Sequence, residues 1–465
     1  MKLKEQRLLP GGYELKNLYI KPYTSRPNEE IKEIFLEFNI RESLFHPFGF
    51  YGSVVMHDAI NFMKYSPIIG DEFLNIRFSE HEGESKFKQA CITHISDQMP
   101  IGENLQGYII NFCSPMAFMN SSNRVCTSFK GKKGSEIVEF LYNTYLKERT
   151  FGDETPGFFG ETSNSMDCII PNWYPIDAIS WVTERCLNEQ NNADFFFWES
   201  YNGGVNFESL ERLLKKDPVG ELSYEPSGGS QTPSETANRP NDSTRIYRKF
   251  PIRRYKVVQE NDSLDNKRNG MYRSKIITHD IVNKTIGGLH DEEKKYRWNY
   301  DEDFKKSFHL GDIKGNEGFP LMGNTGDVTQ QGYHFENNTS YHFKDPSLFP
   351  AQVTENIFPE TYFLNRTAIL QQFNTWVLEV EILGDSELKV GDIMDFEMPS
   401  HEALTGKTVK RPILEMYSGR YIITSIRKSF KQQGLLQTIQ LRKNALAKQY
   451  SKLDKLAVDG YEIGE

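Results

Sequence analysis

The chain has 465 residues, of which 38% are hydrophobic, 13% aromatic and 26% charged, and its formal net charge is −9. This length and composition are typical of a soluble globular protein, which we expect to divide into roughly three or four domains. The acidic balance argues against a protein that binds nucleic acid through phosphate contacts, because such proteins need a basic surface. The many Phe and Tyr residues favour strands over helices, since aromatic side chains suit half-buried pleated surfaces.

The N-terminus is charged and lacks an apolar signal core, and no apolar run reaches the length of a membrane span. We therefore expect no membrane insertion, and assembly in a reducing cytoplasm. The five cysteines form no Cys-x-x-Cys pair, and no histidine cluster has metal-ligand spacing. The expected state is free, mostly buried thiols at Cys91, Cys113, Cys126, Cys168 and Cys186.

The first predicted unit is a small antiparallel β-barrel over residues 30–112. Its opening strand alternates strictly, with Ile34, Leu36, Phe38 and Ile40 on one face and Phe35 as the exception. A returning strand at 50–57 and a short irregular or helical piece at 59–65 follow. Three further strands at hairpin spacing complete the predicted barrel, at 73–78, 86–95 and 105–112.

The pattern then changes to a helical period, which predicts an α+β domain over residues 116–215. One helix begins near Ser135, and a second begins at Pro175, a residue well suited to the first turn. The sequence 195–207 predicts a hairpin, because its central Asn202-Gly-Gly favours a tight turn.

Two segments without clear periodicity follow. Residues 217–245 are rich in Pro, Gly, Ser, Thr and Asn, which predicts a flexible surface linker. Residues 246–352 form a predicted strand-containing irregular region, in which 246–285 have strand character and 286–352 are polar, aromatic and Gly-rich. We expect residues 286–352 to drape over a partner, because this stretch is too long for an ordinary loop.

The last predicted unit is a second β-barrel over residues 360–445, followed by a C-terminal tail at 446–465. A possible helix at 361–373 leads to an alternating strand at 376–382, and a turn at Gly391 and Asp392 opens the next strand. A hairpin at 414–442 closes the unit. The predicted fold class is therefore mostly β with an α+β insertion: two small antiparallel β-barrels flank an α+β middle region.

Four patches, in order along the chain, carry a resemblance. They are residues 34–45 with 66–72, residues 171–179, residues 195–210, and residues 390–392 with 418–426. This series resembles the central hub proteins of T-even-type contractile-tail baseplates, and is also similar to the hub half of type VI secretion spike proteins. The segments 217–245 and 286–352 depart from it, since they are longer than the family's core needs.

The resemblance implies a structural virion protein of a contractile bacteriophage tail. Such a hub is a homotrimer whose two barrels per subunit form a pseudo-sixfold ring, which adapts the sixfold tail tube to the threefold central spike. The implied partners are the spike, tail tube or tube-initiator proteins, and baseplate wedge proteins. DNA is implied only as cargo that passes through the exit channel lined by the ring.

No catalytic signature is found, and we expect no enzyme activity, cofactor or metal. The sequence has no zinc-protease pair of histidines, no nucleophile elbow, no phosphate-binding loop and no dinucleotide fingerprint. Two alternatives stay open: another tail-tip, wedge or tube-initiator protein, and a tail-associated cell-wall hydrolase. The carboxylates of Asp301, Glu302 and Asp303 are the candidates for the second, although their charged run is more typical of a solvated face.

A partner interface is predicted from two features. Trp298 lies in an irregular segment and is the tryptophan that best fits an exposed interface anchor, whereas Trp181 and Trp376 fit core positions. A basic C-terminal cluster either faces an acidic partner such as the spike or forms a solvated strand face. Its candidate residues are Arg427, Lys428, Lys431, Arg442 and Lys443.

Overall fold

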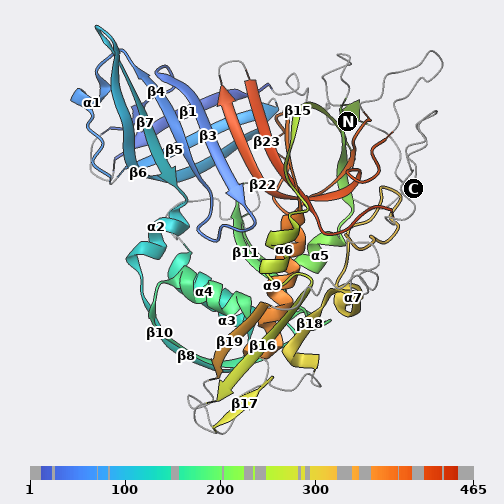
Figure 1. Cartoon of the computed structure of the whole chain (residues 1–465). Coiled ribbons are helices and arrows are strands. Elements are labelled where there is room, and N and C mark those ends of the chain that lie inside the picture. Colours follow the sequence, from blue (N-terminus) through green and yellow to red (C-terminus); the bar gives the residue numbers. More distant parts are fainter. Residues whose placement is uncertain are drawn as a thin grey trace, which may run out of the picture.

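The structure is a computed structural model. It describes residues 12–22, 27–70, 72–81, 84–147, 157–201, 204–224, 234–235, 248–280, 284–288, 294–321, 338–344, 358–385, 387–400, 413–431 and 434–448. Most strands belong to one 14-stranded sheet that curls into two β units at the top of the molecule (Figure 1). The mostly β fold predicted from the sequence is confirmed. Within the described residues, no helix is both long and apolar enough to cross a membrane.

The N-terminal β unit has the strand order β2–β1–β5–β6–β7–β4–β3, with antiparallel pairing throughout. Its strands surround a core that includes Phe38, Val54, Ile76 and Ile110. The short helix α1 (Phe62–Tyr65) follows β4. The strands are β1 (Glu14–Lys21), β2 (Glu29–Glu30), β3 (Phe35–Ser43), β4 (Tyr51–Asp58), β5 (Phe73–His81), β6 (Glu84–Gly102) and β7 (Leu105–Cys113).

The alternation predicted for residues 34–40 is interrupted at its start. Phe35 is buried and Leu36 is 40% exposed, the reverse of the prediction. The pairing of β3 with β4 slips between Phe35 and Glu37, and such a bulge moves the following side chains to the other face. Beyond the bulge, Phe38 and Ile40 point into the core as predicted.

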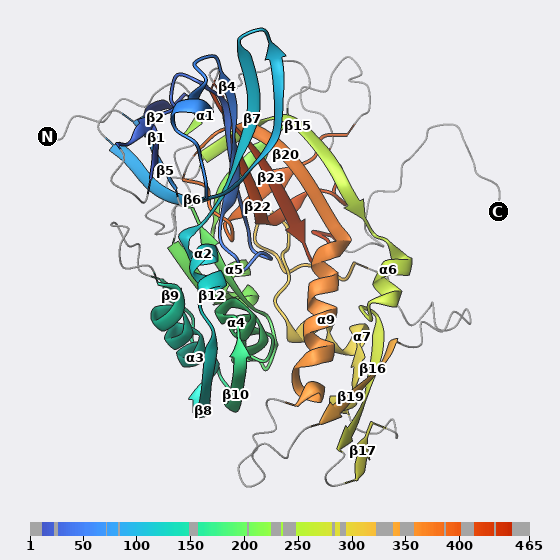
Figure 2. The ribbon, with the colours of Figure 1, turned by 90° about the vertical axis from the view of Figure 1, so that its left-hand side faces the viewer.

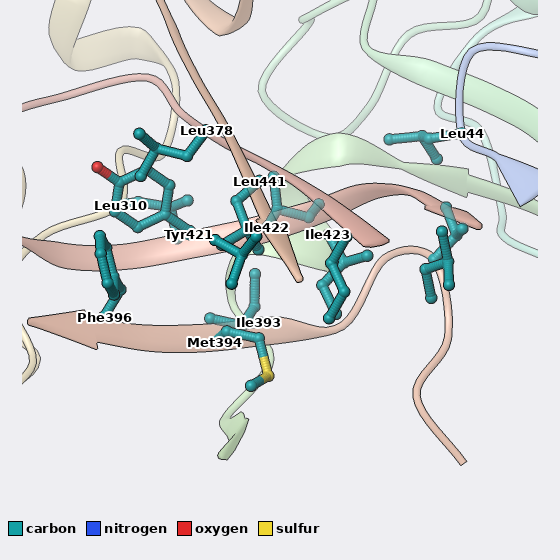
Figure 3. Packing of buried hydrophobic residues seen from close by; sticks show 14 of the residues in the cluster. Leu44, Leu310, Leu378, Ile393, Met394, Phe396, Tyr421, Ile422, Ile423 and Leu441 are labelled. Carbon is teal, nitrogen blue, oxygen red and sulfur yellow. The ribbon is translucent and has the colours of Figure 1, made fainter. Parts of the chain in front are cut away.

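The C-terminal β unit is a closed barrel of six strands. Its order is β22–β21–β13–β15–β20–β23, and β23 pairs back with β22. Figure 3 shows its core, where Ile393, Phe396, Tyr421 and Leu441 pack together. The strands are β13 (Pro218–Ser223), β15 (Arg248–Glu260), β20 (Trp376–Leu383), β21 (Ile393–Glu397), β22 (Gly419–Lys431) and β23 (Gly434–Lys443).

Two of these strands come from segments that the sequence placed outside the second barrel: β13 from the predicted linker 217–245, and β15 from the predicted irregular region 246–352. The linker prediction is wrong for β13, which pairs parallel with both β15 and β21, so the barrel is not purely antiparallel. Only Gly220 and Leu222 of β13 are buried, which is too short a pattern to mark a strand in a Pro- and Gly-containing sequence. A two-residue strand, β14 (Ser234–Glu235), also pairs with β15. The predicted domain boundaries themselves stay predictions.

The α+β middle region lies beneath the two β units (Figure 1). Its hairpin β11–β12 and the helix that begins at Pro175 are found as predicted, and Ile137, Ile179 and Phe207 lie in its core. The elements are α2 (Pro115–Ser122), β8 (Val125–Lys133), α3 (Gly134–Leu141), a π-helical turn (Tyr142–Leu146), β9 (Phe158–Phe159), β10 (Ser165–Trp173), α4 (Pro175–Glu184), β11 (Phe195–Ser200), β12 (Gly204–Ser209) and α5 (Leu210–Leu214).

Described parts of residues 286–352, the segment expected to drape over a partner, belong to a small sheet. Strand β16 pairs with β17, β18 and β19, and Ile276 and Trp298 pack against the next helix, α9. The elements are α6 (Ser263–Arg268), β16 (Arg273–Asp280), β17 (Thr285–Gly287), a 3-10 turn (Lys294–Tyr296), β18 (Arg297–Asn299), α7 (Tyr300–Asp303), a second 3-10 turn (Phe304–Lys306) and β19 (Asn338–Lys344). Residues 246–247, 281–283, 289–293, 322–337 and 345–352 of the predicted irregular region, most of the predicted linker and residues 449–465 of the predicted tail lie outside the described residues.

Helix α9 (Pro359–Thr375) runs between the small sheet and the barrel (Figure 2). Its weak amphipathicity has a structural cause, because its buried side chains include polar ones that bond to several elements. Asn365 Oδ1 accepts a hydrogen bond from Ala193 N at 2.8 Å, and Arg366 Nη1 donates to the carbonyl oxygen of Phe195 at 3.0 Å. Gln371 Nε2 donates to Asn266 Oδ1 at 2.9 Å. Polar side chains of α9 therefore connect this helix to the α+β region and to α6.

Strand β22 joins the two β units. Its residues 425–431 pair with β3 of the N-terminal unit, while β21 and β23 flank it in the barrel. Lys428 of β22 and Glu42 of β3 form an ion pair at 3.2 Å, and each is 1% exposed. Glu42 Oε2 also accepts hydrogen bonds from Ser200 Oγ at 2.9 Å and from Tyr201 N at 2.7 Å. This pair ties the α+β region to both β units.

A second lysine, Lys443 at the end of β23, lies inside the barrel. Its side chain donates to the carbonyl oxygens of Met416 and Ser418, at 2.5 and 3.3 Å, and lies over the rings of Trp376 and Tyr421. Burial lowers the pKa of Lys443 to about 7, because the charged ammonium loses its hydration.

We predict that Lys428→Met destabilises the protein by about 3–5 kcal/mol, because it leaves Glu42 buried without its counter-charge. The double variant Glu42→Gln, Lys428→Met should recover most of this loss, since glutamine still accepts the hydrogen bond from Tyr201 N. Urea unfolding followed by tryptophan fluorescence measures both effects. Lys431→Met is the control, because Lys431 pairs with Glu37 on a half-exposed face. A single variant as stable as the parent contradicts the role of the pair.

We predict a distinct pH dependence for Lys443. Because its folded pKa lies below the unfolded value of 10.5, its contribution to stability is present above pH 10.5 and is lost as the pH falls toward 7. The unfolding temperature of the parent, relative to Lys443→Met, should therefore rise between pH 7 and pH 9.5. Lys431→Met should show no such change relative to the parent. Parallel curves for the parent and Lys443→Met would refute the assignment.

Candidate functional site: one sheet surface across both β units

Eight strands of the two β units form one continuous antiparallel surface. Their order is β6–β7–β4–β3–β22–β23–β20–β15, and each neighbouring pair is antiparallel. Strands β3 and β22 meet in its middle, so each β unit supplies four strands. The two sets of four resemble each other in strand number and direction.

The outward face of this surface is polar. Side chains alternate between the barrel interior and the outside along β23, where Ile439 and Leu441 are buried and Thr438 and Gln440 are only partly buried. The same alternation turns Arg427 and Lys431 of β22 outward, while Ser429 between them is covered and donates a hydrogen bond to Asn39 Oδ1. A polar row therefore crosses the boundary between the two units.

Several charged side chains on this face have a neighbour of the other sign, although Arg427 also lies opposite Arg41. Glu37 of β3 forms ion pairs with Arg427 at 3.7 Å and with Lys431 at 3.4 Å. In the barrel, Arg254 lies opposite Glu381, and Lys256 lies opposite Glu379. Half-exposed pairs of this kind add little stability, but they neutralise basic side chains that would otherwise bind phosphate.

Beneath the face, a loop and a buried acid connect the N-terminal unit to β11. Glu199 of β11 accepts a hydrogen bond from Ser114 Oγ, and burial raises the pKa of Glu199 while that bond and Lys88 oppose the shift. Gly49 approaches this carboxylate so closely that a Cβ atom would lie 2.2 Å from Glu199 Oε2, and its φ is +82°. Only glycine suits this position.

The structure separates the six predicted interface residues into two groups. Trp298 is 5% exposed, and its Nε1 donates to the carbonyl oxygen of Met271 at 3.0 Å, so the prediction of an exposed anchor is wrong. Lys428 and Lys443 are each 1% exposed, and the prediction that they contact a partner is wrong for the same reason. The sequence did indicate that both lysines are buried, because in the alternation of their strands they lie on the same face as buried isoleucines and leucines.

The other three residues reach the surface. Arg427 and Lys431 lie on the outward face, where Arg427 also donates to Asn39 Oδ1 at 3.0 Å. Arg442 is half-buried and stacks on Phe45 at 4.7 Å, and burial lowers the pKa of its guanidinium to about 10. A partner contact by these three residues stays a prediction.

The carboxylates of the alternative hydrolase interpretation do not form a paired site. Asp301 and Glu302 are exposed, whereas Asp303 is buried and accepts a hydrogen bond from Asn299 N at 2.9 Å. Asp303 also pairs with Lys306, so its role is to close a helical turn. In the part of the chain that the structure describes, no group of three or more His, Cys, Asp or Glu residues is placed to hold a metal ion.

No model of a known protein family matches the sequence, and no curated protein matches it either. Solved structures do match. The tail protein from Neisseria meningitidis MC58 has a TM-score of 0.50 and 8% identity, with 93% of this chain and 97% of that protein covered. The 43 kDa tail protein of prophage MuSo2 from Shewanella oneidensis has a TM-score of 0.51 and 8% identity, with 92% and 98% covered.

A more distant match is the c3393 protein of E. coli, described as a type VI secretion component with structural similarity to the T4 tail proteins gp27 and gp5. Its TM-score is 0.41 and its identity 9%, with 94% of this chain and 78% of that protein covered. Of the resemblance inferred from the sequence, the tail-protein fold is confirmed by the Neisseria and Shewanella matches. This chain has, over almost its whole length, the fold of the two bacterial and prophage tail proteins that it matches.

Proposed function

We propose that this chain is the structural hub of a contractile-tail baseplate and assembles as a trimer. The observation that carries the proposal is the eight-stranded surface, to which each β unit contributes four strands. Three copies around an axis would present six similar sets of four strands. Such a ring matches a sixfold tail tube on one side and a threefold spike on the other.

The outward polar face suits the lining of the channel through which DNA leaves. Four of its basic side chains have an acidic neighbour: Arg427 and Lys431 pair with Glu37, and Arg254 and Lys256 lie opposite Glu381 and Glu379. These neighbours reduce the attraction of the four cations for phosphates. The pairing of charges on this face, rather than the acidic balance of the whole chain, supports passage of DNA without retention. The proposed partners are the central spike, tail tube or tube-initiator proteins, and wedge proteins.

We propose a non-enzymatic role in the virion tail, after assembly in the host cytoplasm. The shared fold with tail proteins supports this role. The rival hydrolase interpretation has less support, since Asp303 is used for a helical turn and Asp301 and Glu302 lie in solvent. The rival wedge or tube-initiator role would not require three copies around the axis.

We predict that the purified chain forms a species of three times 53.9 kDa, alone or with its spike partner. Light scattering coupled to size-exclusion chromatography, over a range of protein concentrations, measures the mass. Negative-stain images of the same fractions should show a threefold ring with a central channel. A monomer at every concentration, with and without the spike, would contradict the hub assignment.

A further inference from the structure

Two of the five cysteines lie directly opposite each other on neighbouring strands. In the antiparallel pairing of β6 with β7, Cys91 is in register with Cys113. Residues in register on antiparallel strands place their side chains on the same face of the sheet. The neighbouring residues Ile92 and Phe112 are also in register and belong to the core, so both thiols lie on the other face.

None of the other three cysteines is in register with a cysteine. In the pairing of β8 with β10, Cys126 is in register with Pro171, and Cys168 with Phe129. Cys186 follows α4 and lies outside the strands. All five cysteines belong to the described residues, and each is a free thiol. The pairing of β6 with β7 is therefore the place where strand register brings two thiols together.

The backbone around the two cysteines sets the distance between them. Ile92 N donates to the carbonyl oxygen of Glu72, next to β5, at 3.1 Å. Ser114 N donates to the carbonyl oxygen of Phe50, next to β4, at 2.8 Å. Because backbone groups of successive residues point to opposite sides of a strand, those of the two cysteines point toward each other. Such a hydrogen-bonded pair has Cα atoms about 5.5 Å apart, and disulfides span roughly 4.4–6.8 Å between Cα atoms.

A bond between the two sulfur atoms requires only a small movement of the strands. The Cβ atoms of cross-strand neighbours are about 4.5–5.5 Å apart, whereas a disulfide needs roughly 3.5–4.5 Å. The two Cβ atoms must therefore approach by about 1 Å. The register of β6 breaks between Ile92 and His94, directly after Cys91, and a break of this kind lets a strand bend locally. A bend of β6 at this place supplies the movement.

The two thiols differ in their access to solvent. Cys91 is 3% exposed, whereas Cys113 is partly exposed and lies opposite Tyr51, which is 39% exposed. Burial, and to a smaller extent Glu199, raises the pKa of the Cys113 thiol to about 11. Cys113 is therefore the thiol that meets a dissolved oxidant first. Its reaction is slow at neutral pH, because only the thiolate attacks a disulfide.

We propose that Cys91 and Cys113 form a disulfide by exchange with a small dissolved disulfide such as oxidised glutathione. The Cys113 thiolate attacks one sulfur of the oxidant, which releases one reduced glutathione and leaves a mixed disulfide on Cys113. The Cys91 thiolate then attacks the Cys113 sulfur and releases the second glutathione. The protons of both cysteine thiols end on the two released glutathione molecules, so the cysteines are oxidised and the small disulfide is reduced.

The bond would fix the base of a long and irregular hairpin. The β6–β7 hairpin projects at the top of the molecule (Figure 2), and its pairing beyond Cys91 shifts register three times. It also contains Pro100, which cannot donate to the ladder. In the proposed virion role the chain passes from a reducing cytoplasm to an oxidising exterior, where disulfides persist. This biological consequence rests on the proposed function, whereas the thiol chemistry does not.

Peptide mass spectrometry tests the bond. The reduced full-length chain is incubated with oxidised glutathione at pH 9, alkylated and digested with trypsin. Residues 89–124 form one tryptic peptide, because no Lys or Arg lies between Lys88 and Arg124, and it contains only the two cysteines in question. This peptide should become lighter by two hydrogen atoms and escape alkylation. The exposed Cys126 lies in the next peptide, and its glutathione adduct verifies that the oxidant is active.

Two variants separate the steps of the exchange. Cys91→Ser should stop at the mixed disulfide, so that Cys113 keeps its glutathione. Cys113→Ser should leave the buried Cys91 unreacted. A parent peptide that keeps one glutathione, or two alkylated thiols, after Cys126 has reacted fully would overturn the inference. These readouts do not depend on the oligomeric state, so a chain that fails to form trimers leaves the inference intact, and a chain that fails to form the bond leaves the hub assignment intact.

We predict that the bond slows hydrogen exchange in the β6–β7 hairpin. Backbone amides of residues 93–112 should exchange more slowly by roughly threefold or more in the oxidised parent than in the reduced parent, because the base of the hairpin can no longer open. Cys91→Ser treated with the same oxidant is the matched control and should show no such change. Equal exchange in the oxidised and reduced parent would contradict the role assigned to the bond.

Discussion

The double pairing of β22 is the constraint on which the rest of the structure depends. One strand of 13 residues is a member of the closed barrel and also pairs with β3 through residues 425–431. Because the backbone hydrogen bonds of a sheet fix the distance and direction of neighbouring strands, the two β units cannot turn independently of each other. Their outward faces therefore form one surface, and the spacing of the two sets of four strands is built into each subunit.

A buried ion pair reinforces the pairing of β22 with β3. Lys428 and Glu42 lie on the paired strands β22 and β3, and the carboxylate also holds Ser200 and Tyr201 of the α+β region. A buried ion pair contributes little to stability compared with apolar residues of the same volume, but it penalises any register in which the two charges do not meet. A slip of one residue between β3 and β22 would bury two unpaired charges, so the pair specifies the register.

The sequence predicted most of the strands and helices, but only three of the six candidate interface residues lie at the surface. Alternation located β4, β20 and the β22–β23 hairpin, and helical spacing located α3 and α4, because each of these buries a long regular stripe. Strand β13 was not predicted, because it has only two buried residues of its own and forms through pairing with β15 and β21 on its two sides. Lys428 and Lys443 were assigned to a partner by their charge, although the parity of their strands placed them inside. In that prediction, the charge of the two lysines was given more weight than their position in the strand alternation. The alternation was the better indicator of their burial.

The even number of strands has a consequence for assembly that neither β unit has alone. A sheet with an odd number of antiparallel strands begins and ends with strands of the same direction, and a ring of such sheets would meet at parallel junctions. The join at β22 gives four strands from each unit, eight in all, with opposite directions at β6 and β15. The internal junction between β3 and β22 is antiparallel, like the pairings on either side of it. In the proposed ring of three chains, the set of four strands would occur six times, which is how the proposed hub would present a surface close to sixfold symmetry.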